Sequence, residues 1–118
     1  MDIVSGLALG IDSEAHLACM NGRFGKTVAV LGSPIDNILP SRNKKIADKI
    51  LENGGIIVSE FFLGSKVHPL NFSFRNRIIS GLSVAVLVIE AAQKSGTKRT
   101  FDYAGDQGKT VFAMTGRI

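Results

Sequence analysis

The sequence predicts an α/β protein built on a doubly wound, mainly parallel sheet of about five strands with helices on both faces. Short apolar runs rich in β-branched residues, such as TVAVLG at 27–32, are typical of strands covered on both faces. Segments with helical periodicity separate these runs, which indicates strand–helix–strand units with right-handed crossovers. A length of 118 residues, with 13 glycines and 45% hydrophobic residues, fits one globular domain at 1–118.

Strands and helices are expected to alternate along the whole chain. The expected strands are residues 2–5, 27–32, 55–60, 84–90 and 110–114. The expected helices are 12–21 with Asp12 as the N-cap, 41–53 with Ser41 as the N-cap, a short helix with Asn71 or Ser73 as the N-cap, and a weaker helix over 97–107. Because the chain begins almost inside its first expected strand, we expect a piece of a longer protein that lacks the first strand of its sheet.

Cysteine count, hydropathy and charge exclude several classes of protein. A single cysteine, Cys19, rules out an internal disulfide and a thiolate metal cluster. No apolar run approaches the ~20 residues of a membrane helix, and the N-terminus lacks a signal peptide, so we expect a cytoplasmic protein with no membrane partner. A net charge of +4 and a pI near 9.5 favour an anionic partner.

Basic residues are concentrated in three clusters near the expected strand ends. The clusters are Arg42, Lys44, Lys45 and Lys49; Lys66, His68, Arg75 and Arg77; and Lys94, Lys98 and Arg99. Ligands of doubly wound sheets sit beyond the carboxyl ends of the strands, where all three clusters are expected. The clusters therefore predict an anion-binding rim; the alternative is that they solvate exposed helix faces.

The segment FSFRNR at 72–77 places two cations in the first turn of an expected helix. Exposed cations at this positive end of the helix dipole are unfavourable by ~0.3–1 kcal/mol each. A phosphate or carboxylate bound to the free N–H groups would turn that cost into a gain. Arg75 and Arg77 are thus the first candidates for anion binding; the alternative is that one of them pairs with Glu60 or Glu90.

Two glycine-containing loops could let a backbone approach a ligand closely. VSGLALGID at 4–12 lacks both the G-x-G-x-x-G and the Walker patterns, so it is a weak signal. KSGTKR at 94–99 offers hydroxyl and amide groups beside three cations, through Lys94, Ser95 and Gly96. The alternative for the second loop is an ordinary turn with solvated lysines.

Catalytic patterns are weak, and we predict a binding protein that is not an enzyme. His16 is expected on or near the exposed side of its helix, without a nucleophile in sequence reach. The acidic residues near the rim more often cap helices or pair with arginines than hold a metal, so we expect no metal and no cofactor: Asp12, Asp36, Glu60 and Glu90. One of four phenylalanines is expected to stack with a nucleic-acid base: Phe61, Phe62, Phe72 or Phe74.

Six stretches of the sequence are distinctive: VSGLALGIDSEAH, VAVLGSPID, LPSRN, SEFFLG, FSFRNRIISGLSVAVLVIEAAQKSG and GKTVFAM. In this order they resemble the motifs of the DprA/Smf family of DNA-processing proteins. The resemblance implies a Rossmann-like domain that binds single-stranded DNA, helps load the RecA recombinase in natural transformation, works as a homodimer and is not known as an enzyme. Carried over by position, it implies DNA contacts by Ser5, Gly6, Asn43, Arg75, Asn76, Arg77, Lys94, Ser95 and Gly96. Arg42 and Lys44 are added from charge alone.

The chain departs from the family pattern at several positions. Leu9 stands where the family often has a basic residue, and TKRTFDYA follows KSG in place of a small, apolar helix start. The strand and Gly-Ser/Arg turn that normally open the family's domain are absent. Two alternative functions are a nucleotide-derivative-binding enzyme or sensor of the same Rossmann-like superfamily, and a protein-interaction module with a decayed DNA site.

Overall fold

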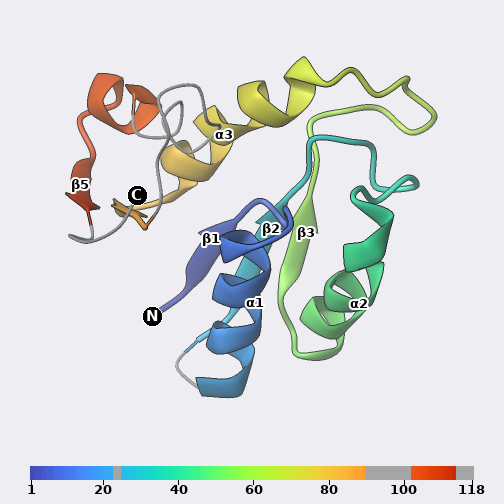
Figure 1. Ribbon diagram of the computed structural model, residues 1–118, viewed down its shortest axis with the longest axis horizontal. Coiled ribbons are helices and arrows are strands. Elements are labelled where there is room, and N and C mark those ends of the chain that lie inside the picture. Colours follow the sequence, from blue (N-terminus) through green and yellow to red (C-terminus); the bar gives the residue numbers. More distant parts are fainter. Residues whose placement is uncertain (23–24, 90–101, 114–118) are drawn as a thin grey trace.

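The computed structural model describes residues 1–22, 25–89 and 102–113 and shows an α/β fold (Figure 1). Its elements are β1 (Ile3–Ser5), α1 (Ile11–Gly22), β2 (Thr27–Val30), the 3₁₀ turn η1 (Ser41–Asn43), α2 (Lys44–Glu52), β3 (Ile56–Val58), α3 (Leu70–Leu82), β4 (Ala85–Val88) and β5 (Thr110–Ala113). Every strand pairing among them is parallel. The predicted alternation of strands and helices is therefore confirmed.

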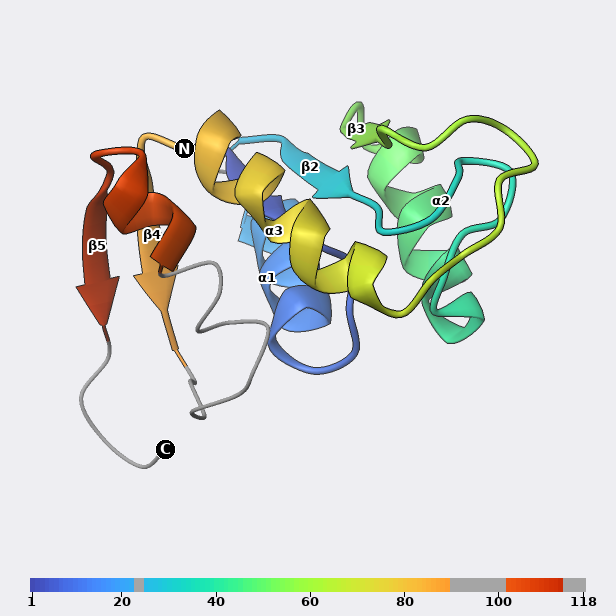
Figure 2. The ribbon, with the colours of Figure 1, turned by 90° about the horizontal axis from the view of Figure 1, so that it is seen from above.

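The first three strands form one sheet in the order β1-β2-β3, with Ile3 opposite Thr27 and Val28 opposite Ile56. α1 and α2 pack against each other on one face of this sheet (Figures 1 and 2). The buried core between helices and sheet consists of Leu7, Ala29, Leu31, Ala47 and Ile50. The carboxyl ends of the three strands open on one edge, which we call the strand-end rim: residues 6–10, 31–43 and 59–69.

β4 and β5 pair with each other in a second parallel sheet, with Val86 opposite Val111. Val86, Val88 and Ala104 form a small buried cluster, to which a helical turn at 102–106 contributes. The sequence predicts one sheet of about five strands, whereas the described strands are divided into three and two, with no hydrogen-bonded ladder between the two groups. Figure 2 shows β4 and β5 side by side, set apart from β2 and β3.

α3 lies across the carboxyl end of the three-stranded sheet, above β1 and β2 (Figures 1 and 2). It begins at Leu70, so the prediction that Asn71 or Ser73 caps it was wrong. Pro69 has helical dihedral angles (φ −54°, ψ −33°), and His68 Nδ1 accepts a hydrogen bond of 3.1 Å from Leu70 N. The cations of the FRNR stretch therefore lie in the second turn, beyond the free N–H groups of the helix start.

The start of α2 also differs from the prediction, because Ser41 lies inside η1 and does not cap the helix. The residue before α2 is Asn43, whose side chain makes no capping bond. The predicted end of α2 is confirmed: Asn53 follows the last turn, and Gly54 has the positive φ of +78° that favours glycine at this position. Among the described residues, no helix is both long and apolar enough to cross a membrane.

Candidate functional site

Side chains from three helical elements hold the backbone of the loop that follows β1. Five consecutive polar groups of this loop are bound: Gly6 O by Arg75 Nη1 (2.7 Å), Leu7 N by His16 Nε2 (3.3 Å), Leu7 O by Asn43 Nδ2 (2.8 Å), Ala8 N by Asp12 Oδ2 (3.2 Å) and Ala8 O by Ser13 Oγ (2.8 Å). A loop with these five backbone groups bound is fixed before any ligand arrives. We call residues Gly6–Ala8 the held loop.

Asp12 contributes to the held loop from inside α1. The helix begins at Ile11 and Gly10 precedes it, so the prediction that Asp12 is its N-cap was wrong by two positions. The carboxylate accepts its bond from Ala8, which precedes the helix. Asp12 therefore fixes the loop and places an acidic group next to the rim.

The conformation of Leu7 explains why the held loop needs so many bonds. Leu7 has a φ of +60°, in the left-handed region that is unfavourable for a residue with a side chain, and it is fully buried in the core. Its buried side chain and the bonds to both of its backbone groups hold it there. Gly6, by contrast, is required by close approach: an added Cβ would lie 2.7 Å from Arg75 Cζ and 2.9 Å from Asp12 Oδ2.

His16 is fully buried, so the prediction of an exposed position was wrong. Thr27 Oγ1 donates to Ile3 O (3.0 Å), which leaves it to accept from His16 Nδ1 (2.6 Å). His16 Nε2 then accepts from Leu7 N, so the ring is neutral with its proton on Nδ1. Burial lowers the pKa of His16 from 6.5 to about 4, against an opposing effect of the Asp12 carboxylate, and this agrees with the neutral ring.

The tripeptide Arg42-Asn43-Lys44 turns its asparagine inward and its cations outward. Asn43 is 4% exposed, and its Nδ2 donates to both Leu7 O and Ser13 Oγ, each at 2.8 Å. Arg42 and Lys44 are exposed on the strand-end rim and at the start of α2. These two cations, which the sequence suggested from charge alone, are therefore placed where an anion could reach them.

Arg75 points into the protein and not toward solvent. Its side chain is 4% exposed, and Nη1 donates to Gly6 O and to Val30 O, both at 2.7 Å, while Nε donates to Asn76 Oδ1 at 3.0 Å. Burial lowers the pKa of the guanidinium, and the Asp12 carboxylate raises it; arginine nevertheless stays charged in proteins. Arg75 therefore fastens α3 to the carboxyl ends of β1 and β2.

Arg77 lies on the outer side of α3 with its side chain 34% exposed. It forms an ion pair with Glu60, which confirms the alternative prediction that one of the two arginines pairs with this residue. Its Cζ also lies 4.1 Å from the ring centroid of Phe74. Two buried side-chain atoms in the described part of the chain have no hydrogen-bond partner, Ser33 Oγ and Arg77 Nε. Both are donors that solvent does not reach, at positions close to the strand ends.

The four phenylalanines near the rim have different environments. Phe62 and Phe74 are 87% and 51% exposed, so either ring could meet a base. Phe61 and Phe72 are partly buried. Phe72 packs against the loop after β2, where an added Cβ on Gly32 would lie 2.6 Å from its ring.

The structure brings most of the predicted site residues to one edge of the sheet, but many of them face inward. Ser5, Gly6, Asn43, Arg75 and Asn76 are buried there. Lys94, Ser95 and Gly96 lie outside the described residues. In the described ranges, no group of three or more His, Cys, Asp or Glu side chains could hold a metal ion.

Sequence reasoning missed the residues that bind the held loop from α1, namely His16 and Ser13. No pattern in the sequence reveals a positive φ at Leu7, and therefore none reveals the need for these bonds. The motif GIDSEAH contains all the contributing α1 residues, which is the one signal that could have drawn attention to them.

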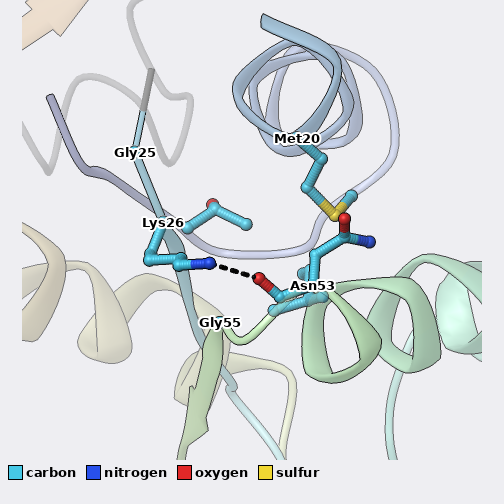
Figure 3. Close-up of a pocket in the computed structure, with 7 residues that line it drawn as sticks. Met20, Gly25, Lys26, Asn53 and Gly55 are labelled. Atoms are coloured by element: carbon cyan, nitrogen blue, oxygen red, sulfur yellow. Dashed lines mark hydrogen bonds between the residues drawn. The ribbon is translucent and has the colours of Figure 1, made fainter. Parts of the chain in front are cut away.

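A pocket of about 360 Å³ lies at the opposite edge of the sheet (Figure 3). It is lined by Met20, Gly25, Lys26, Thr27, Ile50, Asn53 and Gly55. Lys26 Nζ donates to Asn53 O (2.9 Å), at the carboxyl end of α2. Because Lys26 and Gly55 directly precede β2 and β3, this pocket is at the amino ends of the strands and does not belong to the rim.

Comparison with known proteins identifies the family. The sequence model of the family of DNA recombination-mediator protein A matches residues 1–118. The chain belongs to this family. Protein Smf of Escherichia coli is 49% identical over 116 residues, which are 98% of this chain and 31% of that protein. The chain thus spans about a third of the length of this curated relative.

Two solved structures of the DNA recombination-mediator protein A family are similar to this chain. DNA processing protein A of Streptococcus pneumoniae superposes with a TM-score of 0.89 and 42% identity, covering 100% of this chain and 41% of the other. DNA processing protein A of Helicobacter pylori superposes with a TM-score of 0.83 and 31% identity, covering 98% of this chain and 52% of the other. The H. pylori structure was reported for its single-stranded DNA binding mode. The predicted family and Rossmann-like fold are therefore confirmed.

Proposed function

We propose that this chain is a single-stranded-DNA-binding domain that binds without catalysing a reaction. The observation that carries the proposal is the match over 98% of the chain to the H. pylori protein that binds single-stranded DNA. The exposed cations Arg42, on the strand-end rim, and Lys44, next to it at the start of α2, support the proposal, because sequence-independent binding to DNA depends mainly on cations that neutralise phosphates. Lys94, Ser95 and Gly96 are further proposed contacts.

The proposed roles of the remaining site residues follow from their burial. Ser5, Gly6, Asn43 and Asn76 support the rim from within, because their side chains or backbone are buried. Arg77 is a secondary contact, since Glu60 already neutralises its charge while Nε has no partner. From family membership we also propose action in natural transformation, loading of RecA and assembly as a homodimer.

Fluorescence anisotropy of a labelled single-stranded oligonucleotide, titrated at several salt concentrations, tests the proposal. The double variant Arg42→Gln/Lys44→Gln removes two neighbouring exposed cations, one on the rim and one at the start of α2. Its plot of log affinity against log salt should be flatter than the wild-type plot by ~1.4, at ~0.7 per phosphate neutralised on a single strand. Lys26→Gln is the matched control, because it removes an exposed cation at the opposite edge of the sheet.

The proposal fails if the folded wild type does not bind at low salt, or if the Lys26 control flattens the plot as much as the rim variant does. Duplex DNA and mononucleotides serve as competitors. Strong competition by a mononucleotide would favour the nucleotide-binding alternative over DNA binding.

A further inference from the structure

Arg75 occupies an unusual position for a cation of a DNA-binding rim. It is among the most buried charged side chains described, and its Nη1 bonds two carbonyl oxygens that belong to different strand ends. Gly6 directly follows β1 and Val30 is the last residue of β2. One guanidinium therefore fixes the separation of these two strand ends and the position of α3 above them.

The contact with Gly6 links Arg75 to the held loop. The guanidinium lies so close to the Gly6 backbone that no side chain would fit between them. The next residue, Leu7, is kept at a φ of +60° that is unfavourable for a non-glycine residue. Loss of the Arg75 bond removes one of the restraints on this conformation, so the loop is expected to relax toward other conformations while the core of Leu31, Ala47 and Ile50 stays packed.

We propose that Arg75 is a positioning residue of the DNA-binding rim: it fixes the held loop and the end of β2 relative to α3, and does not itself neutralise a phosphate. The proposal rests on the function proposed above. A phosphate contact would require the side chain to leave the carbonyl oxygens of Gly6 and Val30, each of which it binds at 2.7 Å. Breaking these bonds costs free energy. Arg42 is exposed and makes no side-chain bond within the described residues, so it can bind a phosphate without such a loss.

Two variants of Arg75 separate positioning from contact. Arg75→Lys keeps the charge but cannot reproduce the forked geometry, and Arg75→Gln removes the charge. Each is titrated with the labelled single strand across the salt series, with Arg42→Gln as the matched contact variant. Hydrogen exchange of the Leu7 and Ala8 amides is measured in parallel, because the exchange rates of these two amides show how often the held loop opens.

We expect both Arg75 variants to bind about tenfold or more weakly at every salt concentration, with the wild-type salt slope. Arg42→Gln should instead flatten the slope by ~0.7. The Leu7 and Ala8 amides should exchange faster in the Arg75 variants and at the wild-type rate in Arg42→Gln.

Two outcomes would overturn the proposal. A slope flattened by ~0.7 in Arg75→Gln and restored in Arg75→Lys would identify a direct phosphate contact. Wild-type affinity and amide exchange in folded Arg75→Gln would show that the rim does not depend on this residue. If the wild type itself binds no DNA, the proposed function fails, and the amide exchange still decides whether Arg75 positions the loop.

Discussion

The chain contains the same kind of tripeptide, cation-asparagine-cation, at the start of α2 and within α3, and the fold orients the two in opposite ways. In Arg42–Lys44 the asparagine is buried and both cations are exposed. In Arg75–Arg77 the first arginine and the asparagine are buried, and the last arginine is paired with Glu60. The difference arises from the surroundings. α2 runs beside the sheet, and of the first tripeptide only Asn43, in η1 just before this helix, binds the held loop. α3 crosses the strand ends and buries Arg75 against their carbonyl oxygens.

The largest expected effect tests the contrast within α3. Arg75→Met removes the donor to the carbonyl oxygens of Gly6 and Val30. Each unpaired buried group costs ~1–3 kcal/mol, so the free energy of unfolding should fall by about 2–6 kcal/mol. Arg77→Met removes only a partly exposed ion pair and should cost less than about 1 kcal/mol. Urea denaturation measures both, and equal losses would contradict the assignment of the two arginines to different roles.

The next largest effect concerns the pH dependence of stability through His16. Its pKa is about 4 in the folded protein and 6.5 as the ordinary value, so the unfolded chain binds a proton first as the pH falls. This group should therefore lower the free energy of unfolding by ~3 kcal/mol between pH 6.5 and pH 4, and by nothing further below pH 4.

The control for His16 is the variant His16→Gln, measured by urea denaturation at pH 7, 5.5 and 4. The difference in stability between wild type and variant should change by that amount across the series. Parallel stability curves would mean that the ring is protonated in the folded protein or does not titrate as its burial implies.

The smallest of the three effects concerns the tripeptide at α2. Asn43→Ala removes the donor to Leu7 O and to Ser13 Oγ and should cost about 2 kcal/mol in urea denaturation. Lys44→Ala should leave stability unchanged within error, because its side chain is exposed. Equal destabilisation by Lys44→Ala and Asn43→Ala would contradict the inward position of the asparagine and the outward position of the lysine.

The fold was largely predictable because it depends on patterns that the sequence displays. The β-branched runs predicted the strands, and the alternation with helices predicted their parallel pairing. The edge of the sheet where most of the predicted site residues lie was predictable for the same reason, since strand ends are assigned together with the strands. The separation of β4 and β5 from the first sheet was not, because apolar runs do not specify which strands are neighbours.

The orientation of the site residues was much less predictable. A local sequence shows that Arg75 is charged, but its burial depends on the carbonyl oxygens of Gly6 and Val30, which lie 69 and 45 positions away in the chain. His16 was placed on the wrong side of its helix because the residue that needs it, Leu7, is identified only by its backbone angle. Charge patterns thus locate a rim without telling which of its cations face the ligand.

The held loop also has a consequence for how this sequence can change over evolutionary time. His16, Asn43 and Arg75 come from separate parts of the chain, yet each bonds the same three-residue backbone segment. Residues that share a partner show non-additive effects when they are substituted together. A substitution at one of them therefore alters which substitutions the other two tolerate, and the three are expected to be inherited and replaced as a coupled set.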